Sequence, residues 1–115
     1  MTGGFTIKTA LTVFAAAMAF LSFQPASASV QKDIAAGRTL AKARCSACHA
    51  VGAQGASPLA KAPHFRELGR HYPLDNLAEA LAEGIVAGHP DMPSDPWEPE
   101  EIDRLIAYLK SIQTH

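Results

Sequence analysis

Two cysteines and a histidine stand within five residues of one another in the first half of the chain. Cys45, Cys48 and His49 form the pattern Cys-x-x-Cys-His, which is the attachment signature of c-type haem. On a turn of helix these are positions i, i+3 and i+4, so the three side chains project from the same face. The two thiols can then reach the two vinyl groups of a haem as thioethers, while the imidazole points at the iron. The motif predicts one covalently bound haem c per chain.

Two other uses of a Cys-x-x-Cys pair fit the surrounding sequence less well. A thioredoxin-type dithiol lies between a strand and a helix, and no β-branched run precedes Cys45. A structural zinc site normally has a second pair of ligands at short spacing. His64 and His71 are not spaced as such a pair. Both interpretations are therefore weaker alternatives to haem.

A methionine in a proline-rich loop offers a sixth ligand for the iron. Met92 lies between Pro90 and Pro93, in a segment where the prolines disfavour helix. A thioether ligand raises the reduction potential, and core packing is the weaker account of a methionine in so polar a loop. We therefore predict His49 and Met92 as the axial ligands. The alternatives to Met92 are His89 in the same loop and the two histidines considered above for zinc.

The beginning of the chain has the features of a secretory signal peptide. Lys8 supplies a positive charge, and residues 9–23 form an apolar run of about fifteen residues, shorter than the ~20 that span a membrane. A small-residue pattern that ends at Ala28 follows, which predicts a signal peptide at residues 1–28. An uncleaved anchor is the alternative. The mature chain at residues 29–115 is then one small domain, located in the periplasm and not spanning the membrane.

The remaining pattern predicts an all-α fold. A first helix is expected from about Gln31 to Arg44, with Ile34 and Leu40 at helical spacing. A glycine inside this helix, Gly37, indicates close approach by another element. Glycine and proline recur so often in residues 51–73 that we expect a loop there, with at most a short turn of helix.

Two further helices are expected in the second half of the chain. One fits Asp75–Glu83, with Asp75 as N-cap and Gly84 just past the end. The last begins with Pro99 and has two acidic residues in its first turn. Trp97 precedes this helix, where it can pack onto Ile102 as a hydrophobic staple. An apolar stripe is formed by Ile102, Leu105, Ile106, Leu109 and Ile112.

The distribution of charge bears on the partners. The net charge is −1, and no basic stripe is present, so binding to nucleic acid is not expected. Arg38, Lys42 and Arg44 lie near the haem motif and predict a modest basic rim there. The chain has too few lysines for a strong lysine ring, and we expect association with a partner to depend weakly on salt.

Over essentially its whole mature length, the chain resembles the small class I, single-haem cytochromes c of the alphaproteobacterial type. The resemblance rests on the haem motif, on Gly37 eight residues before Cys45, and on the run from Leu105 to Lys110. It implies three main helices and loops wrapped around one covalently bound haem. It also implies that the first and last helices cross at the glycine.

The resemblance assigns roles to further residues. It implies that the Pro63 carbonyl accepts a hydrogen bond from the proximal imidazole and that Phe65 lines the haem cleft. Family members carry Gly-His-Pro-x-Met-Pro around their methionine ligand, which matches the segment around Met92. Ala41 departs from the pattern, because the family commonly has an aromatic residue at that position.

An iron with both axial positions filled has no open site for a substrate. We therefore expect a one-electron carrier and not an enzyme, most simply a monomer that exchanges electrons with a membrane oxidase or a dehydrogenase. Two alternatives stay open. The chain could be a permanent electron-outlet subunit of a dehydrogenase, or a ligand sensor or peroxidase in which the bond from Met92 to the iron is labile.

Overall fold

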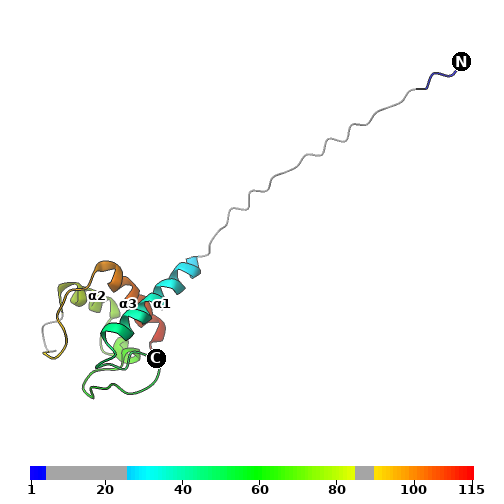
Figure 1. Cartoon of the computed structure of the whole chain (residues 1–115). Coiled ribbons are helices and arrows are strands. Elements are labelled where there is room, and N and C mark those ends of the chain that lie inside the picture. The colour runs from blue at the N-terminus through cyan, green and yellow to red at the C-terminus, as the bar shows by residue number, and fades with distance from the viewer. Residues whose placement is uncertain (5–25, 85–89) are drawn as a thin grey trace.

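A computed structural model describes residues 1–4, 26–84 and 90–115, and the structured part is helical (Figure 1). Helix α1 spans Ala26–Arg44, the 3-10 helix η1 spans Phe65–Arg70, α2 spans Leu74–Glu83 and α3 spans Pro99–Ile112. These described ranges contain no strand, so the all-α prediction is confirmed. Within the same ranges, no helix has both the length and the apolar character needed to cross a bilayer.

Helix α1 begins at Ala26, earlier than the predicted start at Gln31. The additional turn is rich in alanine and serine, and the Ser29 hydroxyl donates a 2.8 Å hydrogen bond to the Ala26 carbonyl. This turn is exposed, and alanine has the highest helix propensity, so local propensity rather than burial extends the helix. The predicted cleavage after Ala28 falls within this turn, whereas residues 5–25 of the predicted signal peptide lie outside the described residues.

The prediction of Asp75 as the N-cap of α2 is wrong. Pro73 is the N-cap residue, and its carbonyl accepts a 3.1 Å hydrogen bond from the backbone N–H of Asn76. Asp75 lies in the first turn instead, where its carboxylate accepts a 2.7 Å hydrogen bond from Lys110. Gly84 follows the last helical residue with φ of 85°, as predicted, because this backbone conformation favours glycine.

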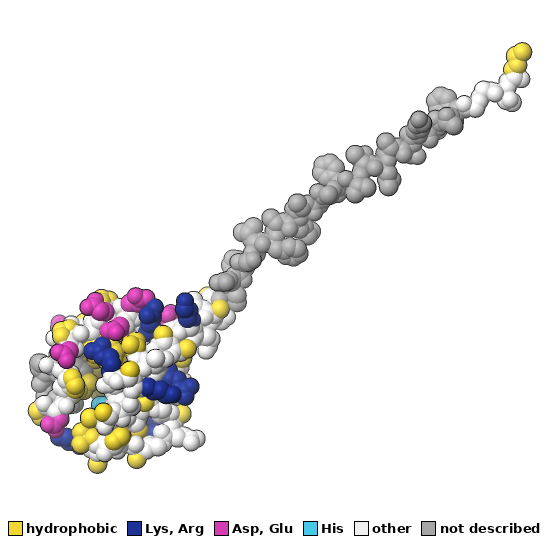
Figure 2. Space-filling view, viewed as in Figure 1, with side chains coloured by type: hydrophobic (Ala, Val, Ile, Leu, Met, Phe, Trp, Pro, Cys, Tyr) yellow, Lys and Arg dark blue, Asp and Glu magenta, His cyan; other side chains and the backbone are white. Residues whose placement is uncertain are grey.

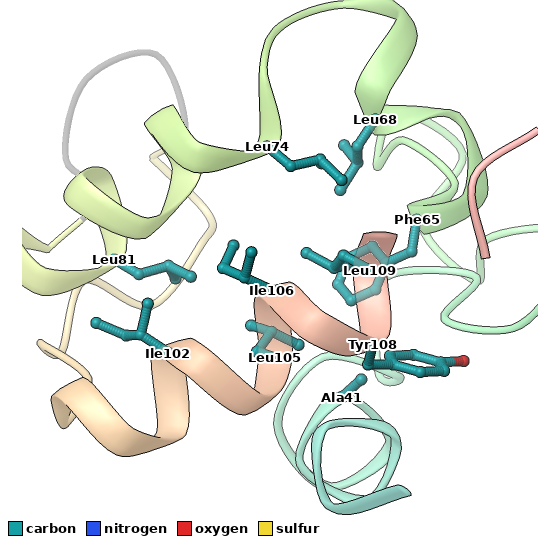
Figure 3. Close-up of a cluster of buried hydrophobic side chains, with 10 residues drawn as sticks. All are labelled: Ala41, Phe65, Leu68, Leu74, Leu81, Ile102, Leu105, Ile106, Tyr108 and Leu109. Carbon is teal, nitrogen blue, oxygen red and sulfur yellow. The ribbon is translucent and has the colours of Figure 1, made fainter. Parts of the chain in front are cut away.

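Helix α3 begins with Pro99, as predicted, and packs against α1, α2 and η1. The backbone N–H of Glu98 donates to the Glu101 carboxylate at 3.4 Å, which helps to fix the start of the helix. The hydrophobic core forms around α3 (Figure 3). Its members are Ala41, Phe65, Leu68, Leu74, Leu81, Ile102, Leu105, Ile106, Tyr108 and Leu109.

Helices α1 and α3 approach each other at Gly37. A Cβ atom built on this glycine would lie 1.9 Å from the Arg104 carbonyl oxygen and 2.8 Å from Tyr108 Cβ. The predicted close approach is therefore confirmed, because no larger side chain fits between the two backbones. Ala41, one turn further along α1, is fully buried and lies beside Tyr108 in Figure 3. A small residue at this position lets the tyrosine ring lie against α1.

Candidate haem-binding site

The last turn of α1 leads directly into the Cys-x-x-Cys-His motif. Cys45 N–H donates to the Ala41 carbonyl at 3.0 Å, and both Cys48 N–H and His49 N–H donate to the Cys45 carbonyl, at 3.2 Å and 3.0 Å. The helical hydrogen bonding thus continues for one turn past Arg44. This turn presents the two thiols and the imidazole to one cavity, as their spacing predicts.

The cavity has a volume of about 960 Å³ and receives side chains from all three α-helices and from the loops between them. This volume is near the upper end of the range of about 300–1,000 Å³ that is usual for cofactor pockets. All six residues predicted for the haem site line it, namely Cys45, Cys48, His49, Pro63, Phe65 and Met92. The exposed surface of the wall is mainly apolar, with alanine and leucine the commonest of the remaining residues, so the cavity suits a large and mainly apolar group.

The loop that contains Pro63 orients the His49 side chain. Its Nδ1 lies 2.8 Å from the Pro63 carbonyl oxygen. A carbonyl oxygen can only accept, so Nδ1 donates and carries the ring proton, which leaves Nε2 free to bind a metal ion. The Phe65 ring packs beside the imidazole, with the two ring centroids 4.9 Å apart and tilted by 43°. These contacts hold the ring in one orientation and tautomer.

Met92 enters the same cavity from the segment between α2 and α3. One close approach and one hydrogen bond place this segment beside the end of α2. The Ser94 carbonyl lies where a Cβ on Gly84 would approach it to 2.5 Å, and the backbone N–H of Trp97 donates to the Leu81 carbonyl at 3.2 Å. Met92 is half-buried, and its side chain belongs to the cavity wall rather than to the main core.

The histidines considered as alternative ligands are placed differently. His64 lies on the surface of η1, with Nδ1 3.2 Å from the Glu67 carboxylate and 3.0 Å from a guanidinium nitrogen of Arg66. His71 is exposed at the end of η1. Neither is part of the cavity wall in the described part of the chain. His89 lies outside the described residues.

Burial disfavours ionisation of the Cys45 thiol. Desolvation raises the pKa of the Cys45 thiol to about 11, and the neighbouring Arg44 charge opposes this rise only in part. A neutral thioether at this place carries no charge for burial to penalise. The environment therefore suits a covalently bonded sulfur better than a reactive thiolate.

Neither alternative use of the cysteines finds support in this geometry. The segment before Cys45 is a helix, not the strand that a thioredoxin-type motif follows. In residues 1–4, 26–84 and 90–115, no group of three or more His, Cys, Asp or Glu side chains is placed to hold a metal ion. The cavity and the orientation of His49 instead fit a haem.

Of the three cations predicted to form a basic rim, one reaches the cavity wall. Arg44 does line the cavity, but its guanidinium lies 3.7 Å from the centroid of the Trp97 ring and donates to the Glu101 carboxylate at 3.1 Å. Arg38 and Lys42 do not line the cavity. Figure 2 shows acidic side chains gathered over α2 and the start of α3, with basic ones dispersed among them.

Sequence reasoning missed several polar members of the cavity wall, among them Lys61, Tyr72 and Asn76. Lys61 forms an ion pair with Asp91. Its position two residues before Pro63 is the one signal that places it near the site. Tyr72 lies just before α2 and Asn76 lies in its first turn, and nothing in their sequence spacing relates them to the haem motif.

An all-helical fold that gathers Cys-x-x-Cys-His and a methionine around one large apolar cavity defines a small haem protein with a covalently attached group. The family model described as cytochrome c matches residues 34–113. A relative named cytochrome c-552, from Bradyrhizobium diazoefficiens, is 33% identical over 87 residues, which cover 76% of this chain and 82% of the relative. The comparison with solved structures gave no significant match.

The chain belongs to the cytochrome c family, as a class I member with a single haem. It is accordingly a haem-based electron carrier whose cofactor is covalently attached haem c. Its partners are redox proteins.

Proposed function

We propose that the chain is a periplasmic one-electron carrier whose haem is attached through Cys45 and Cys48 and whose iron is ligated by His49 and Met92. The observation that carries the proposal is the convergence of these four side chains on one cavity, with His49 Nδ1 held by the Pro63 carbonyl. When bound, the haem supplies an iron that cycles between the ferrous and ferric states.

The chain's own residues hold the group and set its properties. The two cysteines anchor it, and the orientation of His49 leaves Nε2 free to bind metal. Met92 supplies a soft ligand, which favours the ferrous state and raises the reduction potential. The apolar part of the wall would limit the access of water to the haem, which lowers the local dielectric constant. With His49 and Met92 both committed to the iron, the haem would exchange electrons without binding a substrate, so we propose a carrier rather than an enzyme.

The absorption spectrum of the ferric holoprotein tests the ligand assignment. Sulfur-ligated ferric haem has a charge-transfer band in the near-red, and we expect this band in the natural protein. Met92→His should abolish the band and lower the reduction potential by a sizeable part of the ~0.8 V range that axial ligands span. His71→Ala, at an exposed position away from the cavity, is the matched control and should change neither. A natural protein without the band would overturn ligation by Met92.

The same preparation separates the carrier from its alternatives. A carrier should bind no carbon monoxide at neutral pH in the ferrous state. Carbon monoxide binding, or peroxidase activity comparable with the electron-transfer rate, would favour a sensor or peroxidase with a labile methionine. Co-purification with a dehydrogenase in fixed stoichiometry would favour the outlet subunit.

The location in the cell is part of the proposal and has its own test. We propose that a signal peptide at residues 1–28 directs export and is removed, which leaves a mature domain of residues 29–115. Fractionation should recover the haem-stained protein from the periplasm, and its N-terminal residue should be Ser29. Recovery in the membrane fraction with the leader attached would instead show an uncleaved anchor.

A further inference from the structure

An ion pair between Lys61 and Asp91 connects two sides of the cavity. Lys61 belongs to the loop that also carries Pro63, the residue whose carbonyl orients His49. Asp91 directly precedes Met92 on the opposite side. Both residues line the cavity, and Lys61 Nζ donates to the Asp91 carboxylate. The contact thus joins the wall that holds the proximal imidazole to the loop that holds the methionine.

The other contacts in the described part of this loop lie elsewhere. The backbone N–H of Trp97 donates to the Leu81 carbonyl of α2, and the Ser94 carbonyl lies close to Gly84, the residue that follows α2. The Arg44 guanidinium then covers the Trp97 ring at 3.7 Å, where the loop enters α3. Among these contacts, the ion pair of Lys61 with Asp91 is nearest in sequence to Met92.

We propose that Lys61 is a positioning residue, which holds the Met92 loop closed over the cavity through its ion pair with Asp91. This inference rests on the proposed ligation by Met92. The pair acts as a latch: while it is formed, it would keep the Met92 side chain at the cavity, and when it opens, a small external ligand would compete with the methionine more readily. The latch therefore affects how readily an external ligand replaces Met92.

The exposure of the latch determines how strong it can be. The side chains of Lys61 and Asp91 are 65% and 63% exposed. Exposed ion pairs are weak and are screened by salt, with a screening length that falls from about 10 Å at 0.1 M to about 3 Å at 1 M ionic strength. The latch should therefore shift ligand exchange by a modest factor, and its effect should disappear at high salt.

Titration of the ferric holoprotein with imidazole tests the latch directly. Imidazole displaces the methionine, so loss of the near-red band reports binding. At low salt we expect Lys61→Gln and Asp91→Asn to bind imidazole about two- to threefold more tightly than the natural protein. At about 1 M salt the difference should vanish, because the natural pair is then screened.

Two further variants separate the latch from a general loss of stability. Lys110→Gln breaks another exposed ion pair, which Lys110 forms with Asp75. The side chains of these two residues are 53% and 76% exposed, and neither residue lines the cavity. This variant should leave imidazole affinity unchanged. The double variant Lys61→Asp with Asp91→Lys restores a pair of reversed polarity and should bind imidazole as the natural protein does.

The outcomes distinguish the latch from the function on which it rests. If the natural protein lacks the near-red band, ligation by Met92 fails and the latch fails with it. If the band is present but Lys61→Gln binds imidazole no more tightly than Lys110→Gln does, the latch alone is overturned. Failure of the charge-reversed pair to restore the natural affinity would also overturn it.

Discussion

The hydroxyl of Tyr108 connects the last helix to the loop that follows the haem motif. It donates a 2.7 Å hydrogen bond to the Val51 carbonyl, and Val51 is two residues beyond His49. Desolvation raises the pKa of this hydroxyl, against a smaller lowering by the Arg38 charge, so it remains a donor at neutral pH. This hydrogen bond therefore attaches the loop just after His49 to α3, the helix around which the core forms.

We expect Tyr108→Phe to lower the free energy of unfolding by about 1 kcal/mol, because it removes one hydrogen bond from a carbonyl that the fold shields. Denaturant titration of the holoprotein measures this change. Tyr72→Phe, at a side chain that is 39% exposed, is the matched control and should have little effect. Equal stabilities of the two variants would contradict a structural role for the Tyr108 hydroxyl.

Residue types predict this site well where the chemistry depends on local spacing. The two cysteines and the histidine lie within one turn, and the methionine stands out because it is flanked by prolines. Contacts between residues far apart in sequence could not be predicted in this way. The Tyr108 bond to Val51 spans 57 residues, and the predicted rim cation Arg44 stacks on Trp97, a residue more than 50 positions further along the chain.

At the scale of elements, the crossing of α1 and α3 depends on one glycine. Gly37→Ala should lower the free energy of unfolding by about 3 kcal/mol or more, because the new Cβ would lie 1.9 Å from a backbone oxygen of α3 that cannot move independently. Thermal unfolding of the holoprotein measures the loss. Gly52→Ala is the control, since a Cβ there meets nothing within 4 Å. A Gly37→Ala protein as stable as the control would show that the helices can separate without cost.

Element boundaries were less predictable than the elements themselves. The start of α3 was correct because Pro99 fixes its first position. The starts of α1 and α2 were wrong for different reasons. Helix propensity extended α1 into an exposed Ala-rich turn, and Pro73 became the N-cap of α2 in place of the aspartate that usually favours this position. Asp75 instead pairs with Lys110, a partner 35 residues away.

For the molecule as a whole, the cavity makes the fold depend on its cofactor. Without haem, the apolar side chains around the 960 Å³ cavity would lose their packing partner and face water, a loss comparable with the ~5–15 kcal/mol by which domains are usually stable. We therefore expect the chain with Cys45→Ala and Cys48→Ala, prepared without haem, to be largely unfolded. Circular dichroism should show little helix.

The holoprotein in the same buffer is the control and should show the helical content of the structure. A compact haem-free chain that melts cooperatively would contradict this dependence. The all-α class and the need for a large cofactor both followed from the sequence, since so small a domain buries proportionally little surface. The shape of the cavity could not be predicted from the sequence, because side chains from every helix form it.

Trp97 is the single tryptophan of the chain, and it lies in the wall of the cavity. Because haem absorbs at the wavelengths at which indole emits, energy transfer to a haem in this cavity would quench its fluorescence. Separation of the loop from the cavity would restore the emission. The chain thus contains its own optical probe of distance, placed where the methionine loop enters the last helix, and it reports local opening without any added label.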